Sequence, residues 1–232
     1  MTARPEQLPL DLAHRVANGR DDFLVSPSNE AAVRLVDEWP AWPSHAAILT
    51  GPVGSGKSHL AQVWQARSGA KVLKASALAR EDVALAFSNN ALVLEDVTPG
   101  AFDETMLFHV ANVARQNGGQ VLLTSSIEHE QWNVKLPDLA SRLNAFPVIR
   151  IGAPDDALLR GVLVKLFADR QIAVDEALIS YVVLRMPRSL DAARKLVAEI
   201  DRLALAEKAE VTRNFVARVM GKLLSPGLFN DA

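Results

Sequence analysis

The chain of 232 residues contains no cysteine, which excludes disulfide bonds, cysteine-ligated zinc and thiol catalysis. It also has no apolar run of the roughly 20 residues that a membrane-spanning helix needs, and no signal-like apolar run near its start. Its 25 basic and 27 acidic side chains nearly cancel, to a formal net charge of −2, so charge alone does not favour tight, sequence-independent DNA binding. We therefore expect a cytoplasmic protein that does not contact a membrane.

Short apolar runs alternate with amphipathic segments as far as residue 151. Five of these runs are predicted to be strands: 46–50, 71–75, 91–95, 120–124 and 148–151. Helices are predicted over 29–38, from the glycine-rich loop after residue 50 to about residue 67, over 77–87 and over 105–116. Such alternation is typical of an α/β domain whose parallel sheet is covered by helices on both faces.

The pattern changes after Gly152-Ala153-Pro154. Four helical segments follow with no strand among them: 155–170, 175–185, 189–207 and 212–222. The first 22 residues, in contrast, lack a clear amphipathic period. We therefore predict three parts: a flexible leader over 1–22, an α/β core over 23–152 and a small all-helical domain over 153–232.

A glycine-rich loop, Gly51-Pro52-Val53-Gly54-Ser55-Gly56-Lys57-Ser58, follows the first predicted strand and opens a helix. This is the P-loop pattern, in which glycines let backbone N–H groups approach phosphate and the lysine adds charge toward the outer phosphates. The Ser58 hydroxyl is suited to ligate Mg²⁺. The predicted nucleotide-binding residues here are Gly51, Pro52, Gly54, Ser55, Gly56, Lys57, Ser58 and His59. The alternative is an ordinary glycine-rich turn.

Two carboxylates end the third predicted strand, in the run Leu92-Val93-Leu94-Glu95-Asp96. In P-loop proteins, an apolar strand that ends in acids places one carboxylate near Mg²⁺ and the next beside the attacking water. We therefore predict that Glu95 holds the metal, that Asp96 orients water and that both are catalytic. The alternative is a solvated strand end. Because this strand normally presents aspartate first, the longer Glu95 predicts weak ATP hydrolysis by the chain itself.

The order of these motifs resembles the AAA+ superfamily and, within it, the DnaA branch. The resemblance covers about residues 20–222 and includes the strand end Leu123-Thr124-Ser125-Ser126, the pair Ser141-Arg142 and Arg188 at the start of a helix. It implies an AAA+ P-loop core followed by a helical lid. Phe23-Leu24-Val25-Ser26-Pro27-Ser28-Asn29 is similar to a DnaA segment that lies beside adenine, which implies that Val25 contacts the base.

The resemblance also implies roles for individual polar residues. The run 136–143 is similar to the DnaA box that carries an arginine finger, so Arg142 would reach a γ-phosphate bound by another chain and raise hydrolysis there by roughly 10³–10⁵. Arg188 would contact phosphates of the chain's own nucleotide, and Ser125 or Ser126 would be the sensor at the end of the fourth strand. Two alternatives stay open: a surface salt bridge for Arg142 and a helix-start charge for Arg188.

The leader contains the run Gln7-Leu8-Pro9-Leu10-Asp11-Leu12. This run is similar to the short bacterial motif that docks on the sliding clamp, the beta subunit of DNA polymerase III. Gln7 would form a hydrogen bond in one sub-pocket of the clamp, and the apolar anchors would be Leu8, Leu10 and Leu12. The alternative is that the segment packs on its own domain.

Leader and core together resemble the Hda-type regulators of the DnaA branch. Compared with the initiator, we expect this protein to have neither the carboxy-terminal helix-turn-helix domain nor the helical insertion that touches single-stranded DNA. Direct sequence-specific DNA binding is therefore not expected. The resemblance implies a DNA replication inhibitor that binds ATP or ADP with Mg²⁺, docks on the DNA-loaded clamp and stimulates ATP hydrolysis by the DnaA initiator. A self-sufficient helicase loader or remodeller, a nucleotide-dependent scaffold, and assembly into a homo-oligomer stay open.

Overall fold

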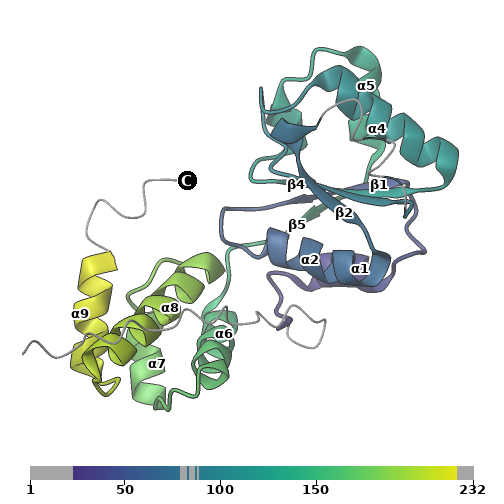
Figure 1. The fold of residues 1–232 in the computed structure, drawn as a ribbon. Coiled ribbons are helices and arrows are strands. Elements are labelled where there is room, and N and C mark those ends of the chain that lie inside the picture. Colours follow the sequence, from purple (N-terminus) through teal and green to yellow (C-terminus); the bar gives the residue numbers. More distant parts are fainter. Residues whose placement is uncertain (1–22, 79–82, 84–86, 88, 224–232) are drawn as a thin grey trace, which may run out of the picture. The chain divides into compact units, whose positions relative to one another are not determined.

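The computed structural model describes residues 23–78, 83, 87 and 89–223. These residues form two compact units that divide between Pro154 and Asp155, slightly beyond the boundary expected after residue 152 (Figure 1). The predicted leader and most of the predicted helix 77–87 lie outside the described residues. Within the part that is described, no helix is long and apolar enough to cross a membrane.

The first unit is built on five parallel strands in the spatial order β2-β3-β4-β1-β5. Their bounds are β1 Ala46–Thr50, β2 Lys71–Lys74, β3 Ala91–Glu95, β4 Gln120–Ser125 and β5 Val148–Arg150. The prediction of all five from their apolar runs is confirmed to within one residue at each end. Strand β4 lies between β1 and β3, so the carboxyl ends of these three strands meet at one edge of the sheet, where open parallel sheets bind ligands.

Helices cover both faces of this sheet (Figure 1). Helices α1 (Glu30–Asp37) and α2 (Lys57–Ser68) pack on one face, whereas α4 (Glu104–Asn117) and α5 (Pro137–Ala145) pack on the other. Because successive strand side chains point to opposite faces, Leu49 joins the core beneath α2 and Ile48 joins the core beneath α4 and α5. This double burial explains why the strands are continuous apolar runs.

Helix α5 is the element that the sequence analysis did not assign. Its first residue is Pro137, which is tolerated there because the first helical N–H needs no intrahelical partner. The helix contributes few apolar residues to the core: Leu139 and Leu143 are the ones buried against the sheet. Two apolar residues one turn apart are too few to reveal a helix by periodicity.

The second unit consists, as far as it is described, of four helices: α6 (Asp156–Asp169), α7 (Glu176–Val183), α8 (Leu190–Glu207) and α9 (Arg213–Leu223). Asp155, Asp175 and Ser189 precede three of them, and each side chain accepts a hydrogen bond from the backbone N–H three residues later. The buried faces of the four helices enclose a core of their own. The predicted all-helical character of this region is confirmed.

Candidate functional site

The P-loop segment, residues 51–56, connects the buried end of β1 to the start of α2. Gly54 and Gly56 adopt positive φ angles of 75° and 106°, a backbone conformation that a side chain would strain. No described side chain caps α2, so the first N–H groups of this 12-residue helix can donate to an anion. The loop therefore has the backbone and the dipole that a phosphate site requires.

The Lys57 side chain folds back over this loop. Its Nζ donates hydrogen bonds to the carbonyl oxygens of Gly51 at 2.7 Å and Pro52 at 2.9 Å. Partial burial lowers the pKa of Lys57, and the negative charge of Asp96 acts in the opposite direction. The Ser55 hydroxyl is buried and, among the described residues, has no hydrogen-bond partner. An orphaned buried hydroxyl beside a partly buried ammonium fits a polar, negatively charged ligand.

The two acids that end β3 lie at the same edge of the sheet as the P-loop. Glu95 is half-buried, and Asp96 is exposed, adopts a positive φ of 59° and donates its N–H to Thr124 Oγ1 at 3.3 Å. Lys74 Nζ lies 3.8 Å from Asp96 Oδ2. The described residues contain no cluster of three metal-ligating side chains, so Mg²⁺ at Ser58 and Glu95 would depend on phosphate and water oxygens for its other ligands.

The segment 23–29 is a compact turn beside the first turn of α2. Buried Asn29 holds it together, because its Oδ1 accepts from Ser26 N at 2.9 Å and its Nδ2 donates to Leu24 O at 3.0 Å. The Phe23 ring meets the His59 ring edge to face, with centroids 5.2 Å apart. Val25 is 50% exposed. This exposure agrees with the expected contact with a base, because a side chain that a base will cover must be accessible before the base binds.

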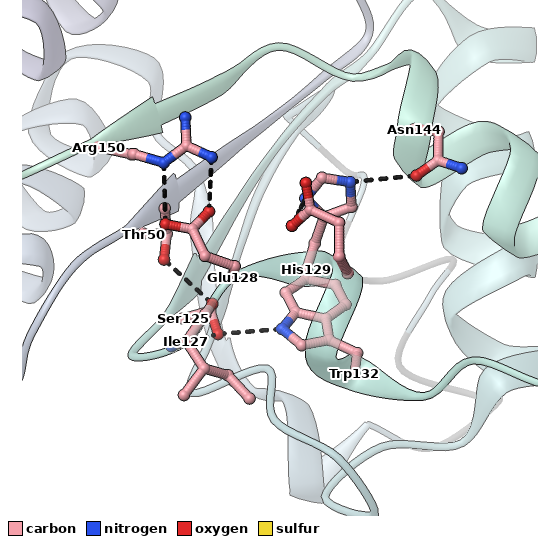
Figure 2. Close-up of polar contacts among 9 residues, drawn as sticks. Thr50, Ser125, Ile127, Glu128, His129, Trp132, Asn144 and Arg150 are labelled. Atoms are coloured by element: carbon pink, nitrogen blue, oxygen red, sulfur yellow. Dashed lines mark hydrogen bonds and ion pairs between the residues drawn. The ribbon is translucent and has the colours of Figure 1, made fainter.

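At the end of β4, the hydroxyl of Ser125 is used inside the protein. It is fully buried and accepts hydrogen bonds from Trp132 Nε1 at 3.2 Å and from Ile127 N at 3.3 Å (Figure 2). By strand alternation Ser125 shares the sheet face of Leu123, beneath α4 and α5 and away from α2. Ser126 is exposed. Both sensor assignments stay predictions, and this geometry favours Ser126.

The loop from β4 to α5 is anchored by three further contacts that the sequence analysis did not find (Figure 2). Thr50 Oγ1 donates to Ile127 O at 3.0 Å, which attaches the loop to the strand that leads into the P-loop. Glu128 accepts two hydrogen bonds from the guanidinium of Arg150, at 2.8 and 2.9 Å. His129 Nε2 lies 3.2 Å from Asn144 Oδ1 on α5. The loop thereby fixes α5 against β1 and β5.

Arg142 lies at the opposite end of the sheet from the P-loop. It belongs to the last turn of α5, and its guanidinium carbon is 4.9 Å from the centroid of the Phe108 ring. Together they line a groove of about 490 Å³, to which Ser44 and His45, directly ahead of β1, also contribute. The P-loop begins after the far end of β1, roughly 16 Å away for a strand of this length. Arg142 is therefore remote from the chain's own P-loop.

Arg188 belongs to the helical unit, directly ahead of the Ser189 cap of α8. Its guanidinium lies 2.9 Å from Asp156 Oδ1, at the start of α6, and both side chains are more than half exposed. Such an exposed ion pair contributes little stability and can be exchanged for a stronger anion. Contact between Arg188 and a nucleotide stays a prediction.

No known family profile matches the sequence, and no curated protein matches it. Solved structures match the fold. Domain III of the replication initiation protein DnaA from Thermotoga maritima superposes with a TM-score of 0.74 at 18% identity, over 90% of this chain and 98% of that one. AMPPCP-bound DnaA from Aquifex aeolicus superposes with a TM-score of 0.68 at 17% sequence identity, and the match covers 90% of this chain and 70% of that one. A variant of RuvB from Thermotoga maritima superposes with a TM-score of 0.68 at 15% sequence identity, and the match covers 89% of this chain and 72% of that one.

The chain has the AAA+ P-loop fold. Its five-stranded parallel sheet and following all-helical domain have the architecture expected from the sequence. At these identities the similarity establishes the fold alone. What an AAA+ core of this kind does depends on the residues placed at the two ends of its sheet.

Proposed function

We propose that this protein is an Hda-like regulator of chromosome replication initiation. It binds ADP or ATP in its own P-loop, docks on the DNA-loaded sliding clamp and stimulates ATP hydrolysis by the DnaA initiator. The finger is Arg142, acting in trans, and the consequence is conversion of the initiator to its ADP form, which prevents re-initiation. In this role the protein is mainly an activator of its partner's ATPase.

The position of Arg142 carries this proposal. An arginine finger offsets negative charge that develops on a phosphoryl group during transfer, so it must reach the γ-phosphate. Arg142 is separated from its own P-loop by the length of β1 and lies on the other face of the sheet from α2. A phosphate that Arg142 contacts therefore belongs to a nucleotide held by a second protein.

The chain's own nucleotide has a structural role in this account. The P-loop N–H groups and Lys57 would hold its phosphates, and the exposed Val25 would contact the base. Bound Mg²⁺ would neutralise phosphate charge, and Ser58 and Glu95 are the residues that we propose would hold it. Nucleotide that binds only the folded core stabilises it by mass action.

Clamp docking by Gln7, Leu8, Leu10 and Leu12 belongs to this proposal and rests on the sequence, since these residues lie outside the described part of the structure. Docking would raise the local concentration of Arg142 near initiators bound on the same DNA. The second candidate function is a self-sufficient ATPase that loads a helicase or remodels another replication protein. It is favoured by the presence of a complete P-loop together with Glu95 and Asp96.

The experiment is a reconstituted conversion assay. DnaA loaded with labelled ATP is mixed with this protein, with and without clamp loaded on DNA, and the fraction of DnaA-bound ADP is followed. We expect rapid conversion that needs the clamp and is lost in the variant Gln7→Ala/Leu8→Ala/Leu10→Ala. High ATP turnover by the protein alone, with no conversion of DnaA-bound ATP, would instead support the helicase-loader or remodeller function.

A further inference from the structure

The groove beside Arg142 is formed by two helices that are distant in sequence. The residues that matter here are Phe108, Ala111 and Arg115 on α4, Asp138 and Arg142 on α5, and His45 ahead of β1. Phe108 and Arg115 are two helical turns apart, so both side chains project from the same side of α4. Ala111 lies between them, and its short side chain leaves the floor of the groove open.

The guanidinium groups of Arg115 and Arg142 therefore line the same groove. Among the described residues, no carboxylate oxygen lies within 4.0 Å of either group, so neither forms an ion pair. Asp138 precedes Arg142 by one helical turn and lines the same groove without pairing with it. Arg142 instead lies over the Phe108 ring, at 4.9 Å. An aromatic ring holds a cation through its quadrupole and leaves the positive charge free to attract an anion, whereas a carboxylate partner would compete with that anion.

We infer that the groove is a preorganised receptor for the triphosphate end of a nucleotide held by the partner's P-loop, in which Phe108 positions Arg142 and Arg115 supplies a second cation. The inference rests on the proposed function, because Phe108 and Arg115 would act together with the Arg142 finger that the proposed function requires. Phe108 acts only through Arg142 and is a positioning residue. Arg115, on the exposed rim of the groove, adds attraction that grows with the negative charge of the phosphate chain. The groove thus distinguishes an ATP-loaded partner from an ADP-loaded one.

The role of Phe108 is tested by single-turnover hydrolysis of ATP prebound to DnaA, at increasing concentrations of this protein. Phe108→Leu keeps an apolar side chain and removes the ring, whereas Phe108→Tyr keeps the ring. We expect Phe108→Leu to lower the maximal stimulated rate about 3- to 10-fold, with the half-saturating concentration unchanged. Because Phe108 is partly buried against the core, the thermal unfolding midpoint should fall by about 2–4 °C, which leaves the protein folded at the assay temperature. Phe108→Tyr should retain the wild-type rate. Wild-type behaviour of Phe108→Leu, or equal losses in both variants, would overturn the positioning role.

The role of Arg115 is tested by measuring affinity for DnaA loaded with ADP or with a non-hydrolysable ATP analogue. We expect Arg115→Ala to weaken binding to the analogue-loaded form about tenfold and to leave binding to the ADP form unchanged. Arg115→Lys should retain most of the affinity, because it keeps the charge. Equal weakening in both nucleotide states would make Arg115 an ordinary interface residue and would overturn this part of the inference.

Arg142→Ala separates the failure of this inference from the failure of the proposed function. If stimulation survives in Arg142→Ala, the finger itself is wrong, and both the function and the receptor fall. If Arg142→Ala abolishes stimulation while Phe108→Leu and Arg115→Ala behave as wild type, the proposed function stands and only the receptor is overturned.

Discussion

A side chain on Gly51 would collide with the backbone of Ile151. A Cβ atom built on Gly51 would lie 2.3 Å from the carbonyl oxygen of Ile151. That segment cannot retreat easily, because the N–H of Ile151 donates to Thr50 O at 2.8 Å. The start of the P-loop is thus locked against the chain that follows β5, and packing requires glycine at this position.

We expect Gly51→Ala to lower the free energy of unfolding by about 2 kcal/mol or more, because the backbone must shift to relieve the contact. The same shift moves the phosphate loop, so ADP affinity falls as well. Denaturant unfolding with and without ADP measures both effects. Gly221→Ala in α9 is the control: no atom of the described residues outside the helix backbone lies within 4 Å of its added Cβ, so stability should stay unchanged or rise by up to about 1 kcal/mol. Equal unfolding of wild type and Gly51→Ala would contradict this account.

Lys57→Ala should weaken ADP binding about 10- to 100-fold, because it removes a charged donor to the phosphates. Isothermal titration calorimetry provides the measurement. Lys71→Ala is the matched control, since Lys71 is an exposed lysine at the amino end of β2, the end of the sheet away from the P-loop. If both variants bind ADP equally well, the loop at residues 51–56 is not the nucleotide site.

Alanine substitutions of Ser125 and Ser126 should have different effects on stability and on ATP hydrolysis. Ser125→Ala leaves the buried Trp132 N–H without its acceptor, which costs about 1–3 kcal/mol of stability and should leave ADP affinity unchanged. Ser126→Ala should leave stability unchanged and slow any hydrolysis of the chain's own ATP. Thermal unfolding and single-turnover assays measure these quantities. A stable Ser125→Ala protein with impaired hydrolysis would assign the sensor to Ser125 instead.

The sheet and the helical unit were predictable because each signal was local. Strand β3 is buried on both faces and so is a plain apolar run, and Asp155, Asp175 and Ser189 mark the helix starts directly. The P-loop was predictable for the same reason, since its glycines and Lys57 are contiguous.

The rest of the site was not predictable because it depends on contacts across the sequence. Choosing between Ser125 and Ser126 requires knowing which sheet face each occupies, and Trp132 as the partner of Ser125 is fixed only by the folded loop. The groove is formed by Phe108 on α4 and Arg142 on α5, an unassigned helix. A motif marks Arg142, but no local pattern gives its distance from the P-loop.

Glu95→Asp should raise the chain's own ATP turnover by about tenfold. The reason is that the glutamate side chain, longer than aspartate by one C–C bond, would shift the water that lies between the carboxylate and Mg²⁺. A steady-state phosphate-release assay on the isolated protein measures this rate. Asp96→Asn serves as the comparison and should lower turnover further. A slower Glu95→Asp variant would show that glutamate is the better residue here and that the weak-ATPase prediction is wrong.

The most direct test of the account asks whose nucleotide Arg142 acts on. DnaA carrying labelled ATP is mixed with clamp-loaded DNA and with wild-type protein, Arg142→Ala or Arg142→Lys, and bound ATP and ADP are separated over time. We predict that wild type converts the label to ADP, that both variants lose about 10³-fold or more in rate, and that all three bind their own ADP equally. Undiminished conversion by Arg142→Ala would contradict the central claim.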